Sequence, residues 1–600
     1  MADQQHPPEP TISPQDLAGL AERTRKVMAE YLQRQAADTA ENPDPLNIGN
    51  AFSQMTQSLI QNPQKLWEMQ AAFWQDYVQL WSNSVRRFWG LEGAAAAKPV
   101  IEPAPSDRRF KDREWSENAA FDFIKQSYLL AARTISQAAD GTDGLDDKTK
   151  HKVEFYTKQF IDAMAPSNFA MTNPEVVRAT LESKGENLVK GLKNLLDDLE
   201  RGKGRLQIKM TDYEAFEVGK NIAVTPGKVV YQNDLIQLLQ YDPTTSTVAK
   251  RPLLIVPPWI NKFYILDLKP TNSFIKWAVA QGQTVFVVSW VNPDERLAQK
   301  TFEDYMDEGI LDAIGAVEKA TGENDLNLIG YCLGGTLSAA TLAYMAAAGD
   351  KRVKSVTFFT TLVDFAEAGD LTVFIDEEQL KSLEARMAKK GYLEGADMAT
   401  TFNMLRANDL IWSFVVNNYL LGKDPFPFDL LYWNSDATRM PAVMHMFYLR
   451  KMYQENLLVK PGGITLRNTP IDLRKVTVPV CILSTKDDHI APWRATYAAT
   501  QLYKGPVKFV LSGSGHIAGV VNPAGSEKYG YWTSDAKKNP KKPEDWLKAA
   551  TQNKGSWWPD WKKWISEFEG EQIPARKPGD GKLKVLGDAP GSYVKVKASD

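Results

Sequence analysis

The sequence predicts an α/β protein whose mainly parallel sheet is preceded by a helical domain. Three observations support this fold class: residues 48–204 are mostly helical in pattern, apolar runs of strand type alternate with helical segments after residue 204, and one of these runs leads into a glycine-rich turn. A chain of 600 residues is too long for one hydrophobic core, so two or more domains are expected.

The composition is that of an ordinary globular protein, with 43% hydrophobic and 24% charged residues. A formal net charge of -3 gives no indication of nucleic-acid binding. Two cysteines, Cys332 and Cys481, cannot form a disulfide framework, and the start of the chain lacks the basic and apolar regions of a signal peptide. We therefore expect a cytoplasmic protein with no transmembrane segment, and we find no residue cluster typical of a metal site.

The N-terminal part of the chain is expected to begin disordered and then to become helical. Residues 1–47 contain a proline-rich start and one possible short helix, which indicates disorder. In the helical pattern that follows, large aromatic side chains recur every seven positions and so share one helix face: Trp67, Trp74, Trp81 and Phe88. Such a stripe is typical of a helix packed within its own domain, or of an interface helix that contacts a second copy, a partner protein or an apolar particle. Residues 91–106 form an expected linker within this helical domain of residues 48–204.

Residues 205–569 are expected to form a second domain that contains the sheet. Several of its candidate strands are continuous apolar runs, as expected for strands that are covered on both faces. The candidate strands are residues 235–241, 252–256, 284–290, 326–329, 355–360, 478–484 and 507–512. Between about residues 365 and 473 the pattern becomes largely helical and aromatic, which predicts a cap above the carboxyl ends of the strands. Residues 570–600 are rich in glycine and proline and are expected to form a C-terminal tail.

The glycine-rich turn follows the apolar run of residues 326–329 and precedes a helix-forming run. Its sequence, Gly330-Tyr331-Cys332-Leu333-Gly334, is the G-x-S-x-G pattern of a nucleophile elbow with cysteine in place of serine. Two other interpretations stay open at this point. The interval between Asp325 and Asp350 carries no charge and is long enough for a membrane span, although its glycines argue against one continuous helix. Cys332 is also compatible with a buried structural cysteine.

An elbow nucleophile predicts an acid and then a histidine, each on a loop after a later strand. The candidate strand 478–484 runs into Asp488, and the candidate strand 507–512 runs into His516. The order of nucleophile, acid and histidine is that of the α/β-hydrolase fold, so we expect this fold with a helical cap insertion. We predict Cys332 as the nucleophile, Asp488 as the acid and His516 as the base.

Neighbouring residues offer alternatives at two of these positions. Asp487 lies beside the chosen acid, and His489 competes with His516 because it directly follows the acid. In the predicted roles, His516 takes the thiol proton of Cys332 while Asp488 fixes the tautomer of the imidazole and stabilises its charged form.

Backbone N–H groups are expected to hold the oxyanion that forms during acyl transfer. One donor is predicted at Leu333, and the other at Trp259 or Ile260 in the loop after the early strand, with Ile260 preferred. A cysteine that attacks a thioester makes another thioester, so the acyl group stays activated and can pass to a hydroxyl group. A hydrolase gains nothing from this property, which therefore favours acyl transfer.

The motifs together resemble those of the poly(3-hydroxyalkanoate) synthases, the bacterial polyester polymerases. The resemblance spans about residues 118–564, and the large helical N-terminal region is similar to that of the class I enzymes, which act without a second catalytic subunit. It is carried by Gly330-Tyr331-Cys332-Leu333-Gly334-Gly335, by Asp488-His489-Ile490-Ala491-Pro492-Trp493, by Ser514-Gly515-His516-Ile517-Ala518-Gly519, by the run from Pro257 to Asp267, by Ser289-Trp290 with Asn292-Pro293-Asp294, and by the run from Leu430 to Asp436.

The resemblance implies an acyltransferase that polymerises (R)-3-hydroxyacyl groups from coenzyme A into a polyester, through an acyl-cysteine, and releases coenzyme A. By position, Cys332, Asp488 and His516 match the nucleophile, acid and base of the family. The resemblance also implies a homodimer at the surface of cytoplasmic polyester granules, with granule-coat proteins as further partners, and no cofactor beyond the thioester substrate. It does not decide whether His516 or Asp488 activates the incoming hydroxyl group. A cysteine-elbow thioesterase and a non-catalytic granule scaffold stay open as alternative functions.

Overall fold

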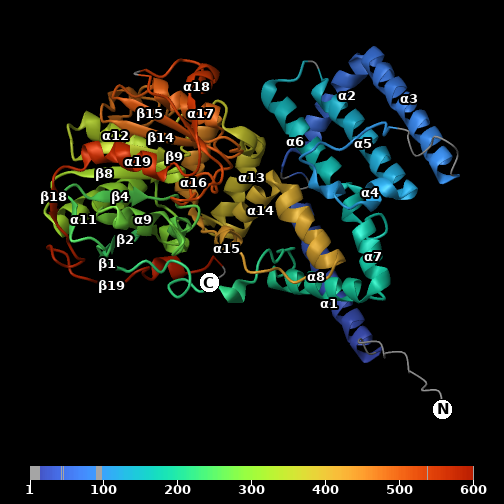
Figure 1. Cartoon of the computed structure of the whole chain (residues 1–600), viewed down its shortest axis with the longest axis horizontal. Helices are drawn as coiled ribbons and strands as arrows, with labels where there is room; N and C mark the ends of the chain where they lie inside the picture. Colours follow the sequence, from blue (N-terminus) through green and yellow to red (C-terminus); the bar gives the residue numbers. More distant parts are fainter. Residues whose placement is uncertain are drawn as a thin grey trace. The chain divides into compact units, whose positions relative to one another are not determined.

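The computed structural model describes residues 14–41, 44, 46–89, 98–142, 144–536 and 538–598, and the chain divides into two compact units (Figure 1). The first unit comprises Met1–Asp212 and Arg406–Phe426, and the second comprises Tyr213–Leu405 and Pro427–Asp600. Part of the segment expected to form the cap, residues 406–426, thus belongs to the helical unit.

Long-range contacts within the first unit explain where residues 406–426 belong. The helix α8 (Glu186–Arg201) lies so close to this segment that a Cβ atom on Gly191 would be 1.8 Å from the carbonyl oxygen of Tyr419. The Tyr419 hydroxyl also donates to Asp198 Oδ2 at 2.6 Å, and Asn187 Nδ2 donates to the carbonyl of Leu420 at 2.8 Å. Such contacts join residues more than 200 positions apart, so local sequence pattern does not reveal them.

The first unit is built from helices. Its helices include α1 (Pro14–Glu41), α2 (Ile48–Gln61), α3 (Pro63–Phe88), α4 (Glu114–Glu117), α5 (Ala119–Asp140), α6 (Asp147–Ala163), α7 (Pro174–Glu182), α8, and the π-helices η9 (Asn408–Trp412) and η10 (Val415–Leu420). Of the segments expected to lack structure, residues 1–13, 42, 43, 45 and 91–97 lie outside the described residues.

Helix α1 occupies most of the stretch for which disorder was expected. Its side chains Leu20 and Val27 are buried against the α8 residues Leu196 and Leu199. Arg23 forms ion pairs with Asp197 and Glu200 of the same helix. The helix therefore packs against residues about 170 positions away in the sequence. The proline-rich composition at the start of the chain gives no indication of this packing.

The second unit is organised by one eleven-stranded sheet with the order β17-β16-β15-β14-β9-β8-β4-β7-β2-β1-β19. The six strands from β7 to β15 in this order are parallel, and the others are antiparallel. The strands are β1 (Gly227–Gln232), β2 (Ile236–Tyr241), β4 (Leu253–Val256), β7 (Val285–Trp290), β8 (Leu326–Tyr331), β9 (Val353–Phe359), β14 (Val480–Thr485), β15 (Val507–Ser512), β16 (Tyr531–Thr533), β17 (Thr551–Asn553) and β19 (Gly587–Asp588). All seven candidate strands are present, so the α/β fold class is confirmed.

Helices cover both faces of the sheet because alternate side chains of each strand point to opposite faces. On strand β4, Leu254 packs in one core and Leu253 in the other. The first core also contains residues of α11 (Asp312–Thr321) and α12 (Leu333–Ala347), whereas the second contains residues of α9 (Phe274–Ala280) and α19 (Trp558–Ile565). Buried strands covered in this way account for the continuous apolar runs in the sequence.

The remaining part of the cap lies within the second unit. It contains α13 (Glu377–Ala388), α14 (Gly395–Leu405), α15 (Asp429–Ser435), α16 (Ala442–Tyr448) and the π-helix η11 (Leu449–Gln454). Residues 570–598, expected as a tail, instead add β18 (Gln572–Pro574) to β3 (Thr247–Ala249) and β19 to β1. Backbone pairing therefore anchors the C-terminal segment to the sheet domain.

Candidate active site

Cys332 lies at the junction between strand β8 and helix α12. Its backbone angles are φ 50° and ψ -117°, which a residue with a side chain rarely adopts. The Cys332 backbone N–H donates to the carbonyl of Phe359 at 2.9 Å, and the Cys332 carbonyl accepts from Gly335 and Thr336 in the first turn of the helix. The strand, strained turn and helix expected of a nucleophile elbow are all present, and the segment does not form one continuous helix. Among the helices of the described chain, none has the length and apolar character needed to cross a membrane.

Two glycines allow the close approaches that this turn requires. A Cβ atom on Gly330 would lie 2.6 Å from the Cα atom of Gly335. A Cβ atom on Gly334 would lie 2.2 Å from the carbonyl oxygen of Val256 and 2.6 Å from that of Pro257. The start of α12 is therefore pressed against the loop that follows β4, and this loop contains Trp259 and Ile260.

Asp488 and His516 are brought together by the loops after β14 and β15. The Nδ1 atom of His516 lies 2.7 Å from Asp488 Oδ2. Both side chains are buried, whereas the neighbouring Asp487 is exposed. The geometry thus pairs the imidazole of His516 with the carboxylate of Asp488.

The two oxygens of the Asp488 carboxylate have four hydrogen-bond partners. Oδ1 accepts from the backbone N–H groups of Ile490 and Ala491, each at 2.9 Å. Oδ2 accepts from Thr485 Oγ1 at 3.0 Å and lies against His516 Nδ1. Burial alone would raise the pKa of Asp488, but the charge of His516 and these hydrogen bonds lower it below its ordinary value. Asp488 is therefore held as an anion.

The pKa of His516 is shifted in the opposite direction. Burial opposes a charged ring, but the negative charges of Asp488 and Cys332, with hydrogen bonds to both side chains, raise the pKa of His516 to about 10. Because Nδ1 is bound to Asp488, the ring nitrogen Nε2 is left for Cys332. The ring also stacks on Tyr331, with centroids 6.0 Å apart and an interplanar angle of 30°. The imidazole is thus fixed in position, and its protonated form is stabilised beside Asp488 and Cys332.

The two predicted oxyanion donors lie on the elements that meet at the elbow. Leu333 is the first residue of α12, so its N–H group belongs to the helix start, where backbone donors lack helical partners. Ile260 lies between β4 and the short 3-10 helix η5 (Phe263–Leu266). Backbone donation from these two positions to a negative charge beside Cys332 stays a prediction.

Two tyrosines of the cap, one buried and one half-buried, were missed by sequence reasoning. Tyr448, at the end of α16, and Tyr453, in η11, have ring centroids 5.7 Å apart. Tyr448 also packs against Trp259 at 6.1 Å. Burial, with the negative charge of Cys332 as a further contribution, raises the pKa of both hydroxyl groups. The only sequence signal was the aromatic character of the cap, which does not say which side chains lie near enough to Cys332 to interact with its charge.

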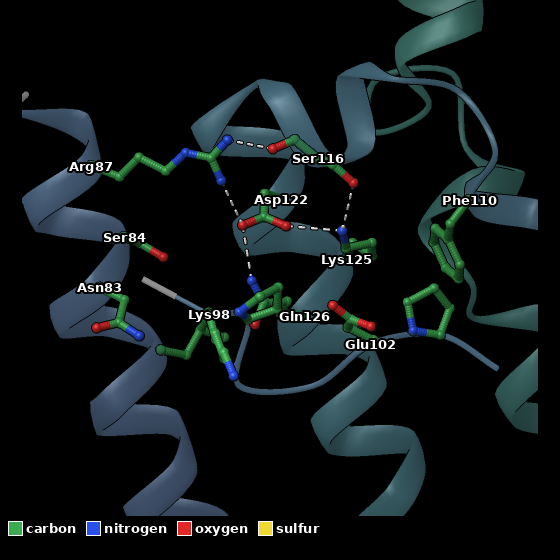
Figure 2. A pocket seen from close by; sticks show the side chains of 13 residues that line it. Asn83, Ser84, Arg87, Lys98, Glu102, Phe110, Ser116, Asp122, Lys125 and Gln126 are labelled. Carbon is green, nitrogen blue, oxygen red and sulfur yellow. Dashed lines mark hydrogen bonds and ion pairs between the residues drawn. The ribbon is translucent and has the colours of Figure 1, made fainter. Parts of the chain in front are cut away.

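A cavity of about 300 Å³ lies in the first unit, between α3, α5 and residues 98–103 (Figure 2). Several of its polar groups bind one another: Asp122 pairs with Arg87 at 3.0 Å and with Lys125 at 2.9 Å, and accepts from Gln126 at 2.9 Å. This network joins helices α3 and α5. Across the parts of the chain that the structure describes, no cluster of three His, Cys, Asp or Glu side chains is arranged to hold a metal ion.

Comparison with known proteins gives two family matches. Residues 106–278 match the N-terminal region of poly-beta-hydroxybutyrate polymerase (PhaC), and residues 253–523 match the alpha/beta hydrolase fold. The second match confirms the α/β-hydrolase fold expected from the elbow.

Characterised relatives match over nearly the whole chain. A poly(3-hydroxyalkanoate) polymerase of Methylorubrum extorquens is 51% identical over 96% of this chain and 97% of its own length. The polymerase subunit PhaC of Rhizobium meliloti (strain 1021) is 49% identical over 97% of this chain and 95% of its own. The PhaC subunit of Cupriavidus necator is 44% identical over 89% of each chain. The chain therefore belongs to the poly(3-hydroxyalkanoate) polymerase family.

Proposed function

We propose that this enzyme transfers (R)-3-hydroxyacyl groups from coenzyme A to a growing polyester by way of a thioester on Cys332. The observation that carries the proposal is the strained elbow that presents Cys332 beside a histidine bound to a buried carboxylate. The enzyme class follows from membership of the family, whereas the catalytic roles rest on this geometry.

In the first step His516 takes the proton of the Cys332 thiol, and the sulfur attacks the thioester carbonyl of the substrate. A new carbon–sulfur bond forms while the carbonyl electron pair moves to oxygen, where the N–H groups of Leu333 and Ile260 hold the charge. Collapse of this intermediate breaks the bond to coenzyme A, and His516 returns its proton to the departing thiolate. The acyl group is then a thioester of Cys332.

In the second step a 3-hydroxyl group attacks the acyl-cysteine. We assign its activation to His516, because Asp488 has a lowered pKa and four donors already fill its oxygens. The hydroxyl proton passes to the imidazole, an ester bond forms, and the Cys332 sulfur leaves and recovers the proton. The chemistry requires no metal and no cofactor besides the coenzyme A of the substrate.

The exposed aromatic face of helix α3 supports a place for the enzyme at the surface of the polyester granule. Trp67, Trp74, Trp81 and Phe88 are between 57% and 72% exposed on this helix. A water-insoluble polyester offers the apolar surface that such a face would cover. A second copy of the chain and granule-coat proteins are the other partners expected for the enzyme. Sedimentation of variants in this face with polyester granules, and their oligomeric state, separate these partners.

The proposed function is tested with 3-hydroxybutyryl-coenzyme A as substrate. We expect free thiol to be released while the acyl groups collect in insoluble polymer. Soluble 3-hydroxybutyrate as the main product would instead identify a thioesterase. Failure of the intact enzyme to release thiol would identify a non-catalytic scaffold.

A further inference from the structure

The peptide group between Trp259 and Ile260 is held by one residue of the cap. Thr438 Oγ1 donates to the carbonyl oxygen of Trp259 at 2.5 Å, and the backbone N–H of Thr438 donates to the carbonyl of Ile260 at 3.3 Å. Thr438 is 1% exposed, so water has little access to replace these bonds.

The first of these bonds fixes the direction of the proposed oxyanion donor. The carbonyl of Trp259 and the N–H of Ile260 belong to the same peptide group, which is planar and, in its trans form, directs the two groups to opposite sides. A hydroxyl that holds the Trp259 carbonyl therefore also sets where the Ile260 N–H points. Rotation of this peptide would turn the donor away and leave the buried carbonyl without its partner.

Thr438 is itself held on both sides. Its neighbour Ala437 forms a β-bridge with Asn261, and the backbone N–H of Arg439 donates to Asn292 Oδ1 at 2.9 Å. The C-terminal segment also holds the residue after Thr438, since the Arg439 guanidinium donates to the carbonyl of Ala598 at 2.6 Å.

The loop that Thr438 binds is attached to the same C-terminal segment. Lys262, which is 2% exposed, donates to the carbonyl of Val596 at 2.5 Å. Trp290 Nε1 fixes the start of the loop by donating to the carbonyl of Pro257 at 2.8 Å. The peptide is thus held within a rigid frame, and Thr438 supplies the contact that orients it.

We propose that Thr438 is a positioning residue of the acyl transfer: its hydroxyl aims the Ile260 N–H at the oxygen that becomes negative when Cys332 attacks the thioester. This inference rests on the proposed function, because it requires an oxyanion beside Cys332. It assigns to the cap a part in assembling the site.

The test compares Thr438→Val, which removes the hydroxyl at nearly constant shape, with Thr438→Ser, which keeps it. Removal of a whole oxyanion donor lowers kcat by about 100- to 1,000-fold, so a misdirected donor is expected to lower kcat by roughly 10- to 100-fold in Thr438→Val. Little change in KM is expected, and Thr438→Ser should recover most of the rate. Thr438→Ala serves as a second variant if Thr438→Val does not fold.

A matched control removes another buried threonine hydroxyl from the same unit. Thr341 is 0% exposed and donates to the carbonyl of Leu337 at 2.8 Å within α12. Thr341→Val is expected to retain kcat, because Leu337 keeps its helical surroundings and does not belong to the oxyanion loop.

The rate at which iodoacetamide alkylates Cys332 distinguishes a misdirected oxyanion donor from a general structural defect. A general defect would slow this alkylation as well as turnover. This reaction forms no oxyanion but depends on the same thiol and imidazole, so its rate should be nearly equal in the wild type and in Thr438→Val. A wild-type kcat in Thr438→Val and Thr438→Ala, or an equal loss of turnover and alkylation, would overturn the proposal. If the wild type itself makes no polymer, the proposed function fails instead, which keeps the two failures distinguishable.

Discussion

Two groups of tryptophans, one in each compact unit of this enzyme, have opposite exposures. In the second unit Trp546, Trp557, Trp558 and Trp561 are each 1% exposed. On helix α3 of the first unit Trp67, Trp74 and Trp81 are 57% to 72% exposed, although the helix packs its other face, with Leu80 at 1%, against α5. Large aromatic side chains are costly to leave in water, so the exposed group is not explained by folding.

The buried group has a structural task close to the chemistry. Trp557 Nε1 donates to the carbonyl of Gly519 at 3.0 Å, and Trp558 Nε1 donates to that of Val520 at 3.0 Å. These carbonyls follow His516 in the same loop. One tryptophan group thus holds the loop that follows His516, whereas the other leaves an apolar face of α3 exposed.

The largest effect is expected for Cys332→Ala, which separates the functions of the two units. Turnover should fall by at least about 10⁴-fold, since residues of such a catalytic unit act together. Binding of the variant to polyester granules should persist, because the exposed face of α3 is unchanged. Cys481→Ala is the control: Cys481 is 1% exposed in β14, and burial raises the pKa of its thiol to about 12. Full activity of Cys332→Ala would remove the elbow from the mechanism.

A second pair of variants tests which histidine the catalytic unit uses. His516→Gln should lower kcat by roughly 100- to 10,000-fold, the range expected for loss of a general base. His489→Gln should be much less impaired, because the Asp488 carboxylate binds His516. Steady-state thiol release measures both, and a greater loss in His489→Gln would reverse the assignment.

The tryptophan comparison itself is tested by equal truncations in the two units. Trp558→Ala should destabilise the enzyme by about 3–5 kcal/mol, the range for a buried large aromatic side chain. Trp74→Ala should change stability by less than about 0.5 kcal/mol, as expected at an exposed site, while it reduces sedimentation with polyester granules. Urea unfolding gives the first quantity and centrifugation the second. Equal destabilisation by the two substitutions would contradict the contrast.

The last prediction concerns the pH dependence of stability. The pKa of His516 is raised from 6.5 to about 10 in the folded enzyme. A raised pKa contributes stability that is fully present below the unfolded value of 6.5 and is lost as the pH rises through about 10. The difference in unfolding free energy between the wild type and His516→Gln should therefore shrink between these two pH values. An increase over this range would show that the imidazole is not stabilised in its charged form.

The sequence predicts best the residues whose positions are set by the strands of the sheet. Cys332, Asp488 and His516 each follow a strand, and parallel neighbours bring these strand ends to one edge, so three distant motifs could be expected to meet. Thr438 and Tyr448 come from the cap, whose path over the sheet is set by long-range packing and not by periodicity. The extent of helix α1 was not predicted for the same reason, because the α8 residues against which it packs are distant in sequence.

The central claim is most directly tested by locating the acyl group during turnover. Rapidly quenched enzyme mixed with 3-hydroxybutyryl-coenzyme A should carry a hydroxyacyl mass on the peptide that contains Cys332, and the same peptide should carry none in Cys332→Ala. Continued release of coenzyme A with the acyl group on another residue, or on none, would contradict the account.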